Sequence, residues 1–294
     1  MRVGISANPS KPRAVEIAVR IIEKLSEAKV ELAVSEELAP RIPSGPAVSA
    51  LPDLRADVLV VVGGDGSFLY ALRASSLPIL PVNAGTVGVL AEVDGNRLGA
   101  IDEVVGRLLT GRFSLEPRLK LAVRVGDAVL PDAANDLALH PGEVARMGLF
   151  DLAIDGASVG RFRADGLVVA TPVGSTGYAL SVNGPVVDPL VDGIVLTTIA
   201  PFRASPRALV IDPFSTIELK VVEPRADALA TIDGQVRALV PSGTLVRVSR
   251  SPRRATFVRF GAPFFERLRG KGILAWNDVD GEGRPPGADV PPGA

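Results

Sequence analysis

The chain has 294 residues, is 47% hydrophobic and carries 32 basic and 33 acidic side chains, for a net charge of -1. Its length leaves room for two cores of ordinary domain size. The evenly spread charge gives no electrostatic basis for binding nucleic acid or an anionic membrane. There is no cysteine and one histidine, His140, which excludes disulfides, thiolate metal sites and multi-histidine metal sites. No apolar stretch is long enough to span a bilayer, so we expect a cytoplasmic protein without membrane or nucleic-acid partners.

The first hundred residues alternate between apolar runs and helical periodicity. Strands are predicted at residues 3–7, 30–34, 58–62 and 79–82, and helices at residues 13–28, 68–73 and 97–109. Residues 40–52, rich in proline and serine, are predicted to form a mobile surface loop. This order is typical of βαβ units, so residues 1–112 are predicted to form an α/β domain with a mostly parallel sheet.

From residue 113 the pattern changes to short alternating runs separated by turn residues. A β-rich, sandwich-like domain of antiparallel strands is predicted over residues 113–262. A helix at residues 264–269, within a segment 263–276, is predicted to pack back on the first domain, and residues 277–294 are predicted to be a disordered tail. The strands of the second domain are predicted at residues 119–125, 149–154, 167–170, 194–199, 216–222, 245–249 and 256–260.

The most informative motif is Gly63-Gly64-Asp65-Gly66-Ser67, between a predicted strand and a predicted helix. Glycines let backbone N–H groups approach a polyphosphate, and the start of the helix adds a positive dipole end. A carboxylate among phosphates is unfavourable unless it binds a metal or takes a proton from an attacking hydroxyl, so Asp65 is the candidate catalytic group. The alternative is an ordinary tight turn in which the aspartate bonds only to its own backbone.

Two further motifs carry polar groups suited to a nucleotide. Residues 83–90 form a second glycine-rich turn after a strand, and the carboxyl ends of parallel strands meet at one edge, so we expect both turns to line one cleft. Asn135 and Asp136 place an amide beside a carboxylate, which suits a base edge and ribose hydroxyls. Such a pair is also common in simple turns.

Residues 165–181 combine a strand, a hydroxyl-rich glycine turn and a helix start. Ser175 and Thr176 can cap that helix or hold a ligand. Tyr178 offers a flat face for a purine, or fills the core with its hydroxyl satisfied. His140 has no serine, cysteine or acid motif arranged around it in sequence, so we predict a loop residue rather than a catalytic base.

Taken together, the motifs resemble those of one family, the NAD kinases, over most of the chain. Four or more motifs in the family's order are much harder to obtain by chance than any one of them. In chain order the sequence is similar to the family's GGDG[T/S] motif at residues 63–67, N-x-G-x-x-G-[FV]-L at 83–90, the Asn-Glu pair at 135–136, D-G-x-x-x-[ST]-T-P-x-G-S-T-[AG]-Y-x-L-S-x-x-G-P at 165–185 and the D-G-Q turn at 231–235.

The sequence departs from the family pattern at a few positions. Ser67 replaces the usual threonine but keeps the hydroxyl, whereas Asp136 replaces glutamate and shortens the reach of that carboxylate by one methylene. Gly177 stands where alanine is common, and Phe202 where many members have histidine. Phe202 lies in a family segment that corresponds to residues 201–207 here, and Arg207 matches the arginine of that segment.

The resemblance implies transfer of the terminal phosphoryl group of ATP or polyphosphate, with Mg²⁺, to the 2′-hydroxyl of the adenosine ribose of NAD. It makes Asp65 the group that orients or deprotonates that hydroxyl, and it implies a homodimer or homotetramer. No dedicated protein ligands for the metal are expected, because the donor phosphates would hold it. Phosphate contacts are implied for Gly63, Gly64, Gly66 and Ser67. NAD contacts are implied for Asn135, Asp136, Asp165, Ser175, Thr176, Gly177, Tyr178 and Gln235.

Two other interpretations fit parts of the sequence. The glycine-aspartate turn also occurs in diacylglycerol, sphingoid-base and sugar kinases, and comparing NAD, a diacylglycerol and fructose 6-phosphate as acceptors would separate these enzymes. A catalytically silent NAD sensor would bind NAD tightly but form no NADP with any donor.

Overall fold

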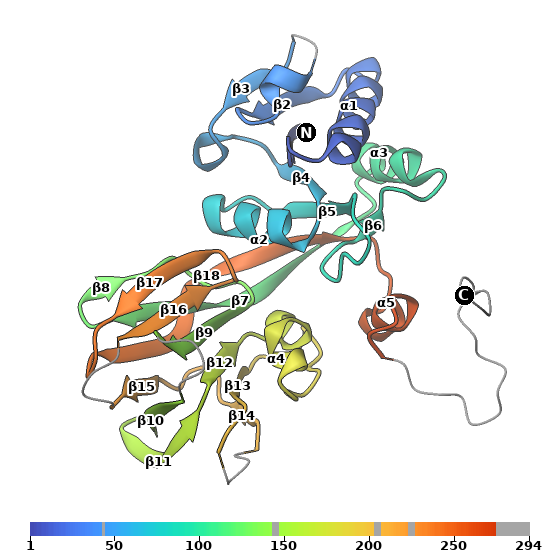
Figure 1. Cartoon of the computed structure of the whole chain (residues 1–294). Coiled ribbons are helices and arrows are strands. Elements are labelled where there is room, and N and C mark those ends of the chain that lie inside the picture. The colour runs from blue at the N-terminus through green and yellow to red at the C-terminus, as the bar shows by residue number, and fades with distance from the viewer. Residues whose placement is uncertain (43–44, 143–146, 203–206, 223–226, 275–294) are drawn as a thin grey trace, which may run out of the picture.

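The computed structural model describes residues 1–42, 45–142, 147–202, 207–222 and 227–274. Figure 1 shows an α/β layer at one end of the molecule and two facing β-sheets at the other. The helices are α1 (Pro12–Glu27), α2 (Asp65–Ala74), α3 (Ala100–Thr110), α4 (Tyr178–Ser181) and α5 (Phe264–Gly270), with short 3-10 turns η1 (Ala39–Arg41), η2 (Leu51–Asp53) and η3 (Val173–Thr176). The strands are β1 (Arg2–Ala7), β2 (Glu31–Ser35), β3 (Ala47–Ser49), β4 (Val58–Gly63), β5 (Ile79–Asn83), β6 (Val93–Asp94), β7 (Ser114–Val125), β8 (Ala128–Val129), β9 (Asp136–Pro141), β10 (Gly148–Ile154), β11 (Ala157–Ala164), β12 (Gly166–Ala170), β13 (Ile194–Ile199), β14 (Leu209–Ile211), β15 (Ile217–Val221), β16 (Ala228–Ile232), β17 (Val236–Val240) and β18 (Leu245–Arg259).

The N-terminal layer is a parallel sheet in the order β5-β4-β1-β2-β3. Its strands are apolar on both sides because helices cover both faces. α1 and α3 pack on one face around Ile17, Ile21 and Val104, and α2 packs on the other through Phe68 and Leu72. From β1 the chain crosses to β2, which lies on one side of β1. From β4 it crosses to β5, which lies on the opposite side of the sheet. The carboxyl ends of β1 and β4 therefore form a topological switch point, where such sheets bind ligands.

The C-terminal part is a sandwich of antiparallel strands. Six strands in the order β14-β13-β12-β9-β16-β17 make the second sheet, and β7, β10, β15 and β18 of the first sheet face it. Leucine, isoleucine and valine side chains from both inner faces, with Phe150 among them, fill the space between. The outer face of the second sheet is covered in part by Ala179 of α4 and by Val182, which follows this helix. The predicted fold class, an α/β part followed by a sandwich-like β part, is confirmed.

One strand joins the two parts. β18 pairs antiparallel with β7 and β15, and through Phe257 it pairs parallel with Ile79 of β5, so the first sheet runs through the whole molecule. The predicted strands at 245–249 and 256–260 are thus one strand, with a bulge between Arg250 and Arg254. The domain limits at residues 112 and 262 stay predictions.

The predicted loop at residues 40–52 was wrong in part. Residues 43–44 lie outside the described residues, but β3 pairs parallel with β2, with Val48 opposite Val34, and short 3-10 turns flank this strand. Three residues are too few for a visible period-2 pattern. The predicted disordered tail at 277–294 lies outside the described residues. Within the described ranges, no helix has the length and apolar character needed to cross a bilayer.

Candidate active site

The two glycine turns lie side by side at the carboxyl ends of β4 and β5, where Gly63 pairs with Asn83. α2 begins at Asp65, so this carboxylate stands in the first turn of the helix. Its Oδ2 accepts a hydrogen bond from the Val89 N–H at 2.9 Å, and its Oδ1 accepts one from the Leu90 N–H at 3.0 Å. Asp65 is thus oriented by the neighbouring turn rather than by its own backbone.

The segment that holds Asp65 is anchored from its other side. Arg259 of β18 donates from Nη1 to the Leu90 carbonyl at 3.2 Å and to the Glu92 carboxylate at 3.1 Å, and both side chains of this ion pair are almost fully buried. Glu92 also contacts Arg267 of α5 at 3.6 Å. Because two buried charges must stay paired, this network fixes the backbone that presents the two amides to Asp65.

The turn before α2 is built to admit an anion. A Cβ on Gly63 would overlap the Ser67 Oγ and lie 2.7 Å from its Cβ, so only glycine allows this tight turn. Among the described residues, the N–H groups of Asp65 and Gly66 have no acceptor, as expected in the first turn of a helix. The Lys11 Nζ lies 3.6 Å from the position that a Gly64 Cβ would take. Free amides, a helix dipole and an ammonium group together suit phosphate oxygens.

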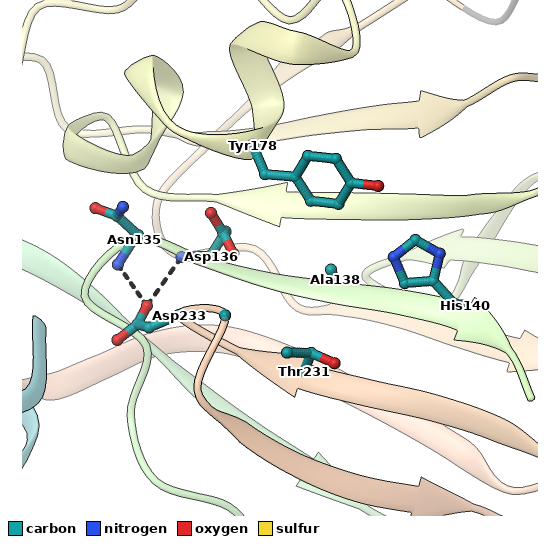
Figure 2. A pocket seen from close by; sticks show the side chains of 8 residues that line it. Asn135, Asp136, Ala138, His140, Tyr178, Thr231 and Asp233 are labelled. Carbon is teal, nitrogen blue, oxygen red and sulfur yellow. Dashed lines mark hydrogen bonds between the residues drawn. The ribbon is translucent and has the colours of Figure 1, made fainter. Parts of the chain in front are cut away.

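A cavity of about 320 Å³ lies on the outer face of the second sheet. Asp136, Ala138 and His140 alternate along β9 and therefore point to the same side. Figure 2 shows the Tyr178 ring, at the start of α4, above this strand, with Ala138 leaving room beneath it. The rings of His140 and Tyr178 are 6.0 Å apart between centroids and inclined by 24°. These flat, partly polar walls suit a purine base.

Asp233 organises the inner end of this cavity. It occupies the hairpin turn between β16 and β17, where Asp233 and Gly234 both have positive φ, 50° and 67°. Its carboxylate accepts hydrogen bonds from the N–H groups of Ala134 at 3.0 Å, Asn135 at 2.8 Å and Asp136 at 3.1 Å. Figure 2 shows the last two of these bonds. The turn therefore fixes the backbone of the Asn135-Asp136 pair.

The same turn reaches across to α2. Gln235 donates from Nε2 to the Gly66 carbonyl at 2.7 Å and accepts at Oε1 from Arg73 Nη2 at 2.8 Å. One turn therefore contacts both parts of the site. Asp233 fixes the backbone of the cavity wall, and Gln235 contacts the helix that begins with Asp65. Asp65 lines neither this cavity nor a second one, of about 270 Å³, which lies beside α2 and is lined in part by Ser67 and Tyr70.

Burial raises the pKa values of two aspartates in the cavity, Asp136 and Asp233. Desolvation raises the pKa of Asp136 to about 7, the negative charge of Asp233 adds to the rise, and a hydrogen bond from the Tyr178 backbone opposes it. Desolvation also raises the pKa of Asp233, and this effect outweighs the three backbone amides that lower it. The Asp136 carboxyl therefore binds a proton at a pH where ordinary aspartates are ionised.

Asp136 should make stability depend on pH. The folded state keeps this proton up to about pH 7, whereas the unfolded chain releases it near 3.8. The contribution of Asp136 to the free energy of unfolding is fully present below about pH 4 and is lost as the pH rises through 7. At 1.36 kcal/mol per pKa unit, the total loss is about 4 kcal/mol. In urea unfolding, Asp136→Asn should lack most of the fall in the free energy of unfolding that the wild type shows between about pH 4 and pH 7. Asp102→Asn, at an exposed site, is the control; an unaltered fall in Asp136→Asn would contradict this origin.

Several residues predicted to contact NAD lie outside the cavity wall. Ser175 is fully buried; its Oγ donates to the Pro172 carbonyl at 2.7 Å and accepts from the Val187 N–H at 3.0 Å. Thr176 donates to the Val173 carbonyl at 3.1 Å. Both hydroxyls are engaged within the protein. Gly177 precedes Tyr178, and its Cβ position lies 3.2 Å from Asn135 Nδ2.

Asp165 is exposed near the outer end of the cavity. Its carbonyl lies 3.2 Å from His140 Nδ1, and its charge helps to raise the pKa of Tyr178, after burial and Asp136. A direct role in NAD binding for this residue, and for Ser175, Thr176, Gly177 and Gln235, stays a prediction.

Sequence reasoning missed several groups of the site. His140 was predicted to be a loop residue, but it lies in β9 and lines the cavity. The signal was available in the spacing, because His140 is four residues after Asp136 and so shares its face. Lys11, Asp233 and Arg73 were not assigned roles, since their partners are distant in sequence.

The described residues contain no group of three histidine, aspartate or glutamate side chains that could hold a metal ion. Mg²⁺ commonly keeps several waters and binds through one or two carboxylates together with substrate phosphates. The phosphate-type turn before α2 fits a metal that is held by the donor phosphates.

The chain matches two family models in order, the ATP-NAD kinase N-terminal domain over residues 3–113 and the ATP-NAD kinase C-terminal domain over residues 134–260. It is 36% identical to an NAD kinase of Thermococcus sibiricus over 91% of this chain and 97% of the relative, and 37% identical to an NAD kinase of Methanopyrus kandleri over 94% and 98%.

Two solved structures are similar over almost the whole chain. Yeast NADH kinase complexed with NADH gives a TM-score of 0.84 at 25% identity, covering 95% of this chain and 88% of that chain. An NAD kinase from Archaeoglobus fulgidus in complex with ATP gives a TM-score of 0.72 at 29% identity, covering 92% and 98%.

The fold, the phosphate-type turn and these similarities define a phosphotransferase that acts on a nucleotide. Both halves of the chain match in order, and relatives above 30% identity extend along nine-tenths of it. The chain belongs to the NAD kinase family.

Proposed function

We propose that the protein transfers the terminal phosphoryl group of ATP to the 2′-hydroxyl of the adenosine ribose of NAD and so forms NADP. The observation that supports this most is the turn at residues 233–235. Through Asp233 it holds the wall of an aromatic cavity, and through Gln235 it holds the helix that begins with Asp65. A nucleotide in the cavity and a donor at the glycine turn would thus be kept in register by one hairpin.

The residues divide the work between binding and chemistry. Tyr178 and His140 would face the adenine, and Asn135 and Asp136 would hydrogen-bond the adenosine part. Asp65 would accept the proton of the ribose hydroxyl as that oxygen attacks the donor phosphorus, and ADP would leave. Phosphoryl transfer depends mainly on positioning and charge neutralisation, so the base supplies a smaller factor than the alignment.

The free amides of residues 65 and 66, with Lys11, would hold the donor phosphates. Mg²⁺, held chiefly by those phosphates, would offset the charge on the transferred group when bound. The metal and the homo-oligomer follow from the family resemblance, and the cytoplasmic location follows from the composition of the sequence; all three belong to this proposal.

A coupled assay tests the function directly. The purified full-length chain would be incubated with NAD and Mg²⁺ and with ATP or inorganic polyphosphate in separate reactions, and NADP would be detected with an NADP-specific dehydrogenase. We expect NADP with ATP, and diacylglycerol and fructose 6-phosphate should not be phosphorylated. Phosphorylation of the lipid or the sugar alone, or tight NAD binding without NADP from any donor, would overturn the proposal in favour of another kinase or a sensor.

A further inference from the structure

The C-terminal helix α5 is docked against the segment that holds Asp65. Figure 1 shows this helix just beyond the end of β18. Its Leu268 is 1% exposed, and the Arg267 guanidinium reaches the buried Glu92 carboxylate at 3.6 Å. Glu92 lies two residues after Leu90, whose N–H donates to Asp65. The helix and the Asp65 carboxylate are therefore both in contact with one short segment of chain.

Lys271 directly follows α5. It comes four residues after Arg267, so the two side chains lie on one face of the helical turn. Arg267 reaches Glu92 beside the last residues of β5, where the Glu92 N–H donates to the Pro81 carbonyl. This face of α5 therefore brings Lys271, which is half-buried, toward the edge of the sheet at which Asp65 stands.

The charged groups around Lys271 agree with this placement. Burial lowers the pKa of Lys271, and Asp65, which opposes that fall, has the largest effect among its charged neighbours. Asp94 also opposes it, whereas the positive charges of Arg267 and Arg259 lower the pKa further. The charged neighbour that acts most strongly on Lys271 is thus the carboxylate proposed as the base.

The Lys271 ammonium is available to a ligand. Among the described residues it forms no hydrogen bond and no ion pair, whereas the buried Lys120 donates to the Leu72 carbonyl at 2.9 Å. A partly desolvated cation without a partner is stabilised by binding an anion. Lys11, at the N-cap of α1, lies near Gly64 of the glycine turn. A phosphate group at this turn would therefore meet positive charge from two separate elements.

We propose that Lys271 binds the phosphoryl group while it passes from the donor to the ribose hydroxyl. The bond from phosphorus to the donor's bridging oxygen breaks, and its electron pair leaves on ADP. The new bond forms to the 2′-oxygen, whose proton goes to Asp65. Negative charge is spread over the three other oxygens of the moving group, and an ammonium beside Asp65 would stabilise it. The inference rests on the proposed function and deepens it, because it makes Lys271 a second catalytic residue.

Binding measurements isolate the terminal phosphate. Calorimetry would compare Mg²⁺-ADP with the Mg²⁺ complex of the non-hydrolysable β,γ-imido analogue of ATP, in the wild-type chain and in Lys271→Met. Methionine keeps most of the length of the side chain and removes its charge. We expect the analogue to bind about tenfold more weakly to the variant, the scale of one hydrogen bond between charged groups. Binding of ADP and of NAD should each change less than about twofold.

Steady-state kinetics tests the chemical role. In Lys271→Met, kcat for NADP formation should fall by about 10²- to 10³-fold, as for removal of one group that stabilises transition-state charge. Lys271→Arg keeps the charge and should retain more turnover than Lys271→Met. Arg269→Met removes a charge from an exposed position of the same helix and should change neither binding nor kcat. Urea unfolding would show that the variants are folded, with Lys271→Gln as a second neutral variant.

Several results would overturn the role of Lys271. Equal weakening of ADP and the analogue would assign the ammonium to the other donor phosphates, and weaker binding of NAD alone would assign it to the diphosphate of the acceptor. A kcat for Lys271→Met within threefold of wild type would remove it from the chemistry. Failure of the proposed function would appear separately, because the wild-type chain would then bind the analogue but form no NADP from ATP.

Discussion

Asp65→Asn is expected to lower kcat for NADP formation by about 10²- to 10⁴-fold, the range found for removal of a general base. The KM for NAD should change by less than about threefold, because the aromatic cavity is built by other residues and Asp65 does not line it. The asparagine retains one oxygen for the Val89 or Leu90 amide but turns an NH₂ group toward the other. We therefore also expect a loss of about 1–2 kcal/mol in the free energy of unfolding.

Steady-state kinetics with NAD varied, together with urea unfolding, separates the two effects. Asp65→Glu is the matched variant, because it keeps the charge and moves it by one methylene. If Asp65 acts as a base, Asp65→Glu should retain more turnover than Asp65→Asn at the same or lower stability. A kcat for Asp65→Asn within tenfold of wild type would remove Asp65 from the chemistry and leave it a turn-fixing residue.

Gly174→Ala is expected to be the most damaging single methyl addition in the site. A Cβ at this position would overlap the Asn135 carbonyl oxygen and lie 2.5 Å from its carbonyl carbon and 2.7 Å from its Cα. These are backbone atoms, and the Asn135 carbonyl already accepts from the Thr171 N–H at 2.8 Å, so the contact cannot be relieved by a rotamer change. We expect the free energy of unfolding to fall by about 2–4 kcal/mol.

The clash also displaces the Asn135-Asp136 pair, so NAD should bind at least tenfold more weakly to Gly174→Ala. Urea unfolding and NAD calorimetry measure the two losses. Gly106→Ala, in α3, is the matched control, since nothing lies within 4 Å of its Cβ position. Replacing a helical glycine at an open site should stabilise by about 0.5–1 kcal/mol. Equal stability and NAD affinity in Gly174→Ala and wild type would show that the backbone can yield at this point.

The coupling between the two halves of the site could not be read from the sequence. Asp233 bonds to amides 97 to 99 residues away, and Gln235 bonds to a carbonyl 169 residues away. Neither contact leaves a trace in local periodicity, because an aspartate in a turn normally bonds to its own backbone. The Asp233-Gly234 turn was recognisable, whereas the role of its carboxylate was not.

The burial of individual side chains could not be predicted from the sequence either. Ser175 reads as a ligand or cap residue, yet the packing of residue 187 against the turn encloses its hydroxyl. Asp136 reads as an ionised carboxylate, and only its enclosure beside Asp233 raises its pKa to about 7. Both outcomes depend on which segments cover a residue, which a local pattern does not specify.

Local sequence information was enough to predict the alternation of strands and helices in the N-terminal part, the β-rich character of the C-terminal part, the glycine turns at the ends of β4 and β5, and the family. Each rests on local information: strand and helix periods, glycines that permit close backbone approach, and motifs in a fixed order. Long-range contacts settled that β18 joins both parts in one sheet, that His140 faces Tyr178, and that a separate cavity lies beside Tyr70. These depend on contacts between distant segments, whose energies are set by packing and burial after the chain has closed its loops.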